Sequence, residues 1–146
     1  MKRLITLLTI CIFFCSHSAW SKGFVVIVNE ENPIEANISQ YFKSRLGEWP
    51  NGEKVEPAEI KVGQDLEKGI IQNAFVTRFL KVQSVAEYRE YWIRQKSKGK
   101  TKRPVEKKSF RAVLRHVRRE AGGVGYIPQK MAEGASGVRI VGEFRP

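Results

Sequence analysis

The residues Phe24–Val28 form an uninterrupted apolar run, Phe-Val-Val-Ile-Val, in which four of the five side chains are β-branched. Such residues favour strands, and a strand without polar alternation is one that is buried on both faces. This pattern is typical of a parallel sheet that has helices against each face. The run therefore favours an α/β fold.

Segments with helical spacing alternate with short strands along the rest of the chain, which supports the same fold class. Apolar residues recur at helical intervals from Ile34 to Leu46 and after Asp65, Ser84 and Ser109. Side chains of the Asp and Ser types accept hydrogen bonds from free N–H groups at a helix start, so the last three are predicted N-caps. The helix after Asp65 is expected to bury two rows, Leu66, Ile70, Ala74 and Ile71, Phe75, Phe79.

Four further segments complete the predicted architecture. Short strands are expected over 124–127 and 138–141, and the basic stretch 96–108 is predicted to be a loop. The segment 55–60 alternates in polarity, but Pro57 indicates an edge or irregular strand because it lacks a backbone N–H. We predict one α/β domain over residues 22–146, with a largely parallel sheet flanked by helices on both faces.

The first 21 residues have the layout of a secretory signal peptide. A short basic head precedes an apolar run of about 12 residues, which is shorter than the roughly 20 residues that span a bilayer. Ala19 and Ser21 are small residues at the two positions that signal peptidases usually read, so cleavage is expected after Ser21, with Ala19 as the alternative. An uncleaved anchor and a lipid anchor on Cys15 are less favoured. We expect a periplasmic protein with no membrane span after cleavage.

The mature chain contains no cysteine and one histidine, because Cys11 and Cys15 both fall in the leader. It can form no disulfide, and a Cys/His zinc site or another cofactor is not expected. No metal-ligand spacing and no nucleophile–base pair stands out, so we expect a protein that is not an enzyme. His116 is interpreted as a surface residue, with a role as a base as the alternative.

Residues 94–119 form a basic segment with twelve Lys or Arg and one acid, Glu106, so that its net charge equals the +11 of the whole chain. It would attract an anionic partner such as an acidic protein face, and the alternative is a solvated surface. Nucleic acid is not expected, because aromatic residues do not interleave the run. The patch comprises Lys100, Lys102, Arg103, Lys107, Lys108, Arg111 and Arg115.

Four short segments, taken in order, resemble the phosphate-binding proteins of ABC transporters, in the type 2 periplasmic binding protein superfamily. They are Phe24–Val28 with Asn29 and Asn32-Pro33, Ile38–Gly52, Phe75–Leu80 with Tyr91-Trp92, and Gly122–Ile127. The resemblance implies a periplasmic-binding-protein-like fold. Members of that family are about twice as long and close two lobes around an oxyanion. This chain has room for a single lobe.

The resemblance also implies a small oxyanion such as phosphate as ligand and an ABC permease as partner. The sequence departs from the family at its anion-binding loops: the first has no counterpart, and Gln64–Ile70 stands in place of the second. Asp65 and Glu67 place negative charge there. Weak oxyanion binding is therefore assigned to backbone N–H groups around Asn29, Asn32, Gln64 and Asp65.

The expected function is that of an exported solute-binding-like protein related to these phosphate-binding proteins. The alternative is a periplasmic interaction module that docks on an acidic envelope partner through the basic segment 94–119. Trp49, in a predicted loop, is either a cleft residue or part of the core.

Overall fold

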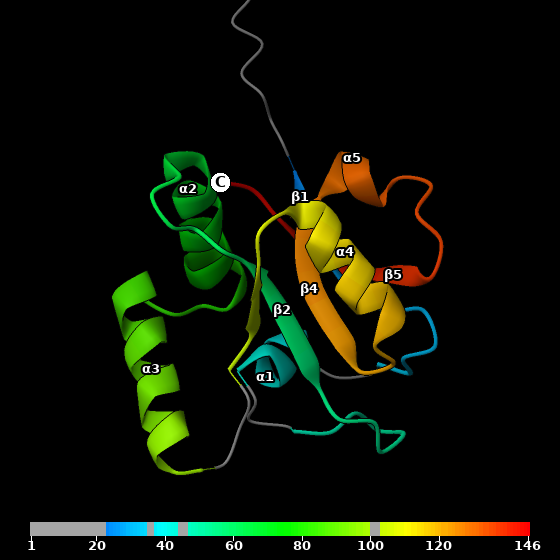
Figure 1. Ribbon diagram of the computed structural model, residues 1–146, viewed down its shortest axis with the longest axis horizontal. Coiled ribbons are helices and arrows are strands. Elements are labelled where there is room, and N and C mark those ends of the chain that lie inside the picture. Colours follow the sequence, from blue (N-terminus) through cyan, green and yellow to red (C-terminus); the bar gives the residue numbers. More distant parts are fainter. Residues whose placement is uncertain (1–22, 35–36, 44–46, 100–102) are drawn as a thin grey trace, which may run out of the picture.

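The computed structural model describes residues 23–34, 37–43, 47–99 and 103–146, so the predicted leader and its cleavage site lie outside the described residues. The elements follow the chain in this order: β1 (Phe24–Asn29), α1 (Ile38–Phe42), β2 (Glu56–Ile60), α2 (Leu66–Ala74), the π-helical η1 (Phe75–Phe79), α3 (Val85–Ser97), β3 (Val105–Lys107), α4 (Phe110–Arg119), β4 (Gly123–Pro128), α5 (Gln129–Ala132) and β5 (Val138–Phe144). Figure 1 shows the strands between two groups of helices.

The strands form one five-stranded sheet in the order β3-β2-β4-β1-β5. β2 is parallel to β3 and β4, whereas β1 is antiparallel to β4 and β5. Four strands therefore share one direction, and β1 runs against them. The strand at Phe24–Val28 is confirmed, but its assignment to parallel pairing is wrong, because an apolar run reports cover on both faces and not strand direction.

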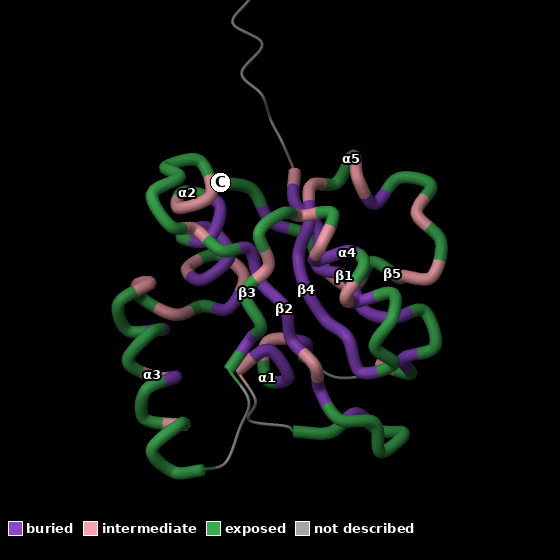
Figure 2. Tube along the Cα trace, in the orientation of Figure 1, coloured by how far each residue is buried: buried purple, intermediate pink, exposed green. Residues whose placement is uncertain are grey.

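Helices cover both faces of the sheet, as predicted. On one face Val25 and Ile27 of β1 pack in a cluster with Val113 and Val117 of α4. On the other face Val26 packs in a larger cluster that includes residues of α1, α2, η1 and α3. The buried strands lie in the middle of the molecule, and the outer surfaces of the helices are exposed (Figure 2). The mixed α/β fold is therefore confirmed.

The prediction of β2 as an edge strand is wrong, because β2 lies between β3 and β4. Glu56 N–H donates to the Gly122 carbonyl before β4, and Lys61 N–H donates to the Lys107 carbonyl of β3. Backbone groups alternate sides along a strand, so the missing N–H of Pro57 faces β3. Pairing with β3 begins one residue later, at Ala58. The proline therefore costs the sheet no hydrogen bond.

The three predicted N-caps are confirmed. Asp65 Oδ1 accepts the Lys68 N–H at 3.0 Å, Ser84 Oγ accepts the Glu87 N–H at 3.1 Å, and Ser109 Oγ accepts the Ala112 N–H at 3.1 Å. Each bond satisfies one of the N–H groups that have no partner within the helix. The sequence therefore determines locally where these helices begin.

Of the two rows predicted to be buried on α2, one is largely exposed. Leu66 is 84% exposed and Ile70 is 60% exposed, whereas Ile71, Ala74 and Phe75 are buried. The helix therefore packs against the core through the row that contains Ile71 and Phe75, and Leu66 and Ile70 of the neighbouring row face solvent. The first predicted helix is described only over Ile38–Phe42, with Asn37 as its N-cap, and part of its predicted range lies outside the described residues.

The loop predicted over 96–108 is wrong in part, since it contains β3 at Val105–Lys107. This strand is three residues long and pairs only with β2, so it carries no alternation that a sequence pattern could reveal. The short helix α5 was not predicted either. No helix in the described part of the chain is long and apolar enough to cross a membrane.

Candidate functional site

Asn29, a predicted ligand residue, is buried and its side chain makes hydrogen bonds within the protein. It is 7% exposed. Its Nδ2 donates to the carbonyls of Val117, Arg118 and Glu120 at 3.1–3.2 Å, and its Oδ1 accepts the Glu31 N–H at 3.0 Å. These carbonyls are at the C-terminal end of α4, where the helix supplies no partner. The side chain therefore fixes α4 to the end of β1.

Asn32 is also inaccessible, with 1% of its surface exposed. Its backbone carbonyl accepts a hydrogen bond from the Arg139 guanidinium. Neither amide atom of its side chain has a hydrogen-bond partner among the described residues. The backbone N–H groups of this turn, which were predicted to bind the anion, are also in use: Glu30 donates to the Gly137 carbonyl, Glu31 to Asn29 Oδ1 and Asn32 to the Asn29 carbonyl.

The structure also separates the predicted ligand residues into two groups. Val28 pairs with Val124 at the start of β4, and β4 there pairs with Glu56 and Pro57 at the start of β2. Gln64 and Asp65 instead follow the end of β2. A five-residue strand is about 17 Å long, so the two groups lie at opposite ends of the strands. The prediction that Asn29, Asn32, Gln64 and Asp65 serve one site is wrong.

Gln64 and Asp65 lie at the edge where β2, β3 and β4 end, and both are exposed. The Asp65 carboxylate accepts the Lys68 N–H, and its Oδ2 lies 3.5 Å from Lys68 Nζ. The bond from the Lys68 backbone holds the pKa of Asp65 below its usual range. An ionised carboxylate thus already occupies the start of α2.

A groove of about 670 Å³ opens at this edge, which we call the carboxyl-edge groove. It lies where β1 begins and where α2, α4 and α5 begin, and it is lined by Gly23, Phe24, Asp65, Glu67, Lys68, Ile71, Phe110, Pro128, Gln129, Lys130 and Glu133. In α/β sheets, ligands bind outside the carboxyl ends of the strands. Helix N-termini also favour anions. Three acids and two lysines line the groove, however, which weakens its attraction for anions.

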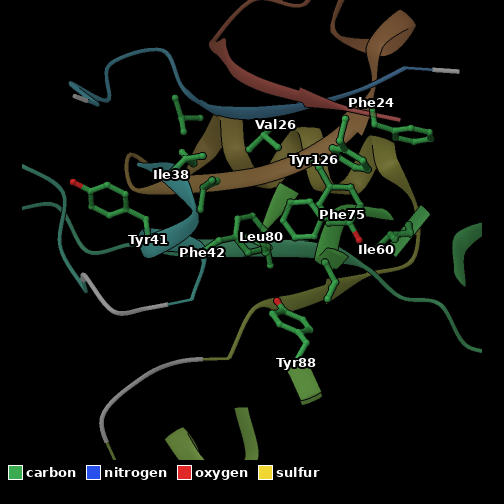
Figure 3. Close-up of a cluster of buried hydrophobic side chains, with 14 of the residues drawn as sticks. Phe24, Val26, Ile38, Tyr41, Phe42, Ile60, Phe75, Leu80, Tyr88 and Tyr126 are labelled. Carbon is green, nitrogen blue, oxygen red and sulfur yellow. The ribbon is translucent and has the colours of Figure 1, made fainter. Parts of the chain in front are cut away.

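A second group of polar residues, beneath α3, was missed by the sequence analysis. Glu59 of β2 is 2% exposed, and the Tyr88 hydroxyl lies 3.4 Å from its Oε2. Burial raises the pKa of Glu59 to about 7. Burial, and next the charge of Glu59, raise the pKa of Tyr88 and of Tyr126 well above the usual range. Figure 3 shows Tyr88 extending from α3 towards the sheet.

Two further polar atoms of this group, Trp92 Nε1 and the Tyr126 hydroxyl, are buried without a hydrogen bond of good geometry among the described residues. The Tyr88 side chain is the polar neighbour of Trp92, and the Ile60 backbone is that of Tyr126. The signal in the sequence is the position of Glu59 between Ala58 and Ile60. A strand covered on both faces buries every side chain, including a carboxylic acid.

The residues of the predicted basic patch are divided among separate elements. Arg103, 3.0 Å from Glu106, precedes β3, and Lys107 and Lys108 follow at its end. Arg111 and Arg115 are exposed on α4, which also carries Arg118 and Arg119 and no acid. Lys100 and Lys102 lie outside the described residues. Of the described residues in the patch, Arg111 and Arg115 therefore share one helix, and the others lie at β3.

Trp49 and His116 have structural roles. Trp49 is buried, its ring stacks on Tyr41 with centroids 4.0 Å apart, and its Nε1 donates to the Gly122 carbonyl at 3.0 Å. It therefore belongs to the core and not to a cleft. His116 is half-buried, with Nε2 3.1 Å from the Glu56 carbonyl. Among the residues that the structure describes, no group of three His, Cys, Asp or Glu side chains could hold a metal.

No family model and no curated protein matches this chain. Two solved structures share its fold. One is an ABC-type phosphate transport receptor from Vibrio cholerae, with a TM-score of 0.51 and 11% identity over 82% of this chain and 45% of the receptor. The other is a possible phosphate binding protein from Planctomyces limnophilus, with a TM-score of 0.52 and 15% identity over 82% of this chain and 40% of that protein. The chain thus spans less than half the length of these proteins and has the α/β fold of a single lobe.

Proposed function

We propose that this chain is an exported solute-binding-like protein that binds a small oxyanion such as phosphate weakly, and that it is not an enzyme. The observation that carries the proposal is the carboxyl-edge groove, which lies where ligands bind in α/β sheets and where α2 and α4 begin. The fold that it shares with a phosphate transport receptor supports this choice of ligand class.

The start of α4 is the stronger half of the groove. Ser109 satisfies the Ala112 N–H, and the earlier N–H groups of the helix have no partner within it. Asp65 competes with an anion at the start of α2, and Glu67 and Glu133 add negative charge nearby. Weak binding is expected from this balance of charges.

The sharpest test is to remove the competing charge at Asp65. Asparagine is an equally good N-cap, so Asp65→Asn removes the charge and keeps the helix start. We expect phosphate to shift the Phe110 and Arg111 amide resonances, and the variant to bind it about threefold more tightly. Glu87→Gln, which removes an acid from the first turn of α3, is the matched control and should change nothing. No shift at tens of millimolar phosphate or sulfate would refute the proposal.

Export is the second part of the proposal and rests on the leader. Mass spectrometry of the protein from the periplasmic fraction should give a chain that begins at Lys22. An ABC permease is the partner expected for uptake, and co-purification with a permease would support that role. A chain that keeps its leader and sediments with membranes would contradict export.

One observation favours a different binding role: the outer face of α4 carries four arginines and no acid. On this alternative the protein docks on an acidic envelope partner, and the association weakens as salt rises. Changing Arg111 and Arg115 to Glu should abolish it, whereas changing Lys54 and Arg145 to Glu, two exposed cations outside residues 94–119, should not. Binding that survives the α4 change would exclude the alternative.

A further inference from the structure

Helix α2 carries two large apolar side chains that face solvent. Leu66 is 84% exposed and Ile70 is 60% exposed, and the two residues are one turn apart on the same side of the helix. The helix itself lies at the periphery of the molecule, away from α4 (Figure 1). Single exposed apolar residues are common, but two that share one helix face form a surface that another element can cover.

A hollow of about 420 Å³ lies beside these two side chains. Gly69 and Asn73 of the helix and Val62 of the preceding loop line it together with Leu66 and Ile70. We call the surface formed by Leu66, Gly69, Ile70 and Asn73 the α2 face. It therefore contains both projecting apolar side chains and a hollow next to them.

Gly69 is the residue of the α2 face that the fold does not explain. Glycine within a helix is destabilising relative to alanine. A methyl group on Gly69 would meet no atom outside its own helix closer than Val62 Cγ1, at 3.6 Å, which is an ordinary van der Waals contact. The packing within one copy of the described chain therefore does not require a glycine here. Its effect is to keep the hollow beside Leu66 and Ile70 open.

The α2 face combines a ridge with a groove. When helices pack, residues at i and i+4 form a ridge that fits into a groove of the neighbouring helix. Leu66 and Ile70 form such a ridge, and Gly69 and Asn73 form a shallow row beside it. A second copy related by a twofold axis presents its ridge to this groove and its groove to this ridge. The α2 face is therefore self-complementary, as a twofold interface requires.

The charges around the α2 face also favour a second copy. Asp65 and Glu67 stand at the start of α2, whereas Arg78 and Lys81 follow its end. Lys68 lies away from the α2 face, at the carboxyl-edge groove. The two acids disfavour an acidic protein or an anionic membrane as the occupant. In an antiparallel second copy, the acids of one helix lie towards the cations of the other.

We propose that this chain forms a dimer in which the α2 faces of two copies pack antiparallel. Leu66 and Ile70 of each copy lie against Gly69 and Asn73 of the other. An interface centred on one helix is small, and small interfaces are typical of weak, reversible association. The dimer is therefore in equilibrium with the monomer. The proposal does not depend on phosphate binding at the carboxyl-edge groove.

The test is sedimentation equilibrium of the purified protein from micromolar to millimolar concentration. We expect the weight-average mass to rise from that of one chain towards that of two. Ile70→Asp places a charge in the interface and should weaken association about tenfold or more. Ile93→Asp is the matched control, because Ile93 is 67% exposed on α3 and does not line the hollow. It should leave the association unchanged.

Gly69→Ala separates a role in the interface from a role within one copy. Alanine is the better helix former, so the variant should raise the Tm by a few degrees at concentrations where the protein is monomeric. The added methyl group occupies part of the hollow, so association should weaken several-fold. A glycine needed only within one copy would instead lower the Tm when replaced.

Reversing charges tests the antiparallel arrangement. At low salt, Glu67→Lys and Lys81→Glu should each weaken association several-fold, because each places like charges opposite one another in the dimer. The variant that carries both changes should associate as the parent does. In a parallel arrangement acids already face acids, so the single changes would have no effect, and that result would overturn the proposed dimer.

Other occupants of the α2 face would give different results. A chain that stays monomeric at millimolar concentration, or that loses association equally in Ile70→Asp and Ile93→Asp, would overturn the proposal. Co-sedimentation with vesicles of phosphatidylglycerol and phosphatidylcholine tests a lipid surface. Vesicle binding that is lost in Ile70→Asp, by a protein that is monomeric in solution, would assign the α2 face to a membrane and also overturn the proposal.

Discussion

Asn29 connects the end of β1 to the last turn of α4 through three hydrogen bonds from one amide group. Asn29→Ala would leave those carbonyls without a buried donor, so we expect the free energy of unfolding to fall by about 2 kcal/mol in urea titrations. Asn51→Ala is the control, because Asn51 is exposed and accepts a single N–H from Glu53. It should change stability by less than about 0.5 kcal/mol. Similar losses in both variants would contradict this role of Asn29.

The carboxyl of Glu59 makes stability depend on pH. Burial raises the pKa of this carboxyl from its ordinary value of 4.5 to about 7, so the folded protein binds the proton more tightly. Its contribution to stability is therefore greatest below pH 4.5 and is lost as the pH rises towards 7. Glu59→Gln stays neutral, so at pH 8 it should be more stable than the parent by up to about 3 kcal/mol. Urea titrations at pH 5 should show a difference of only about 1 kcal/mol, and a constant difference would contradict the assignment.

At the scale of single residues, the sequence showed which polar residues stand out but did not predict what they do in the structure. Asn29 is singled out by its position after a buried strand, but its partners lie about 90 residues further on, where a local pattern cannot reach. Glu59 was missed for a related reason. A glutamate is expected to be exposed, and its burial can be predicted only when the elements that pack on both faces of its strand are known.

Among the elements, α4 depends most clearly on its N-cap, Ser109. Ser109 accepts the Ala112 N–H, and the helix it begins packs Val113 and Val117 against the sheet. Ser109→Ala should lower the free energy of unfolding by about 1 kcal/mol, whereas Ser109→Asp should retain stability because aspartate caps equally well. Thermal and urea unfolding measure both. If alanine and aspartate prove equivalent, the cap does not stabilise α4.

The elements that the sequence predicted are those whose signals are local. The three caps and the apolar run of β1 lie within a few residues of what they specify, and all are found in the structure. The antiparallel pairing of β1, the internal position of β2 and the existence of β3 depend on neighbours distant in the sequence. The prediction of the site was less accurate than that of the elements for the same reason. Whether Asn29 and Gln64 lie close together depends on the directions of the strands that precede them, and a local pattern does not give these directions.

At the scale of the whole molecule, the two apolar clusters share one sheet. Val26 belongs to the larger cluster and Ile27 to the smaller one, and both are fully buried on β1. Because β1 contributes to both clusters, disrupting the packing of one cluster also removes support from the other. We therefore expect the domain to unfold in one cooperative transition. Fluorescence of Trp49 and Trp92 reports only the larger cluster, because both residues pack there.

Val117→Ala tests this coupling from the opposite face, since Val117 is fully buried in the smaller cluster. We expect a loss of about 2 kcal/mol from the missing methyl groups and the cavity that they leave. The fluorescence midpoint and the circular dichroism midpoint should fall together, although neither tryptophan touches the altered cluster. Val105→Ala, at a position that is 41% exposed, is the control and should leave both midpoints in place. A fluorescence transition that stays fixed while the helical signal shifts would show that the two faces of the sheet unfold independently.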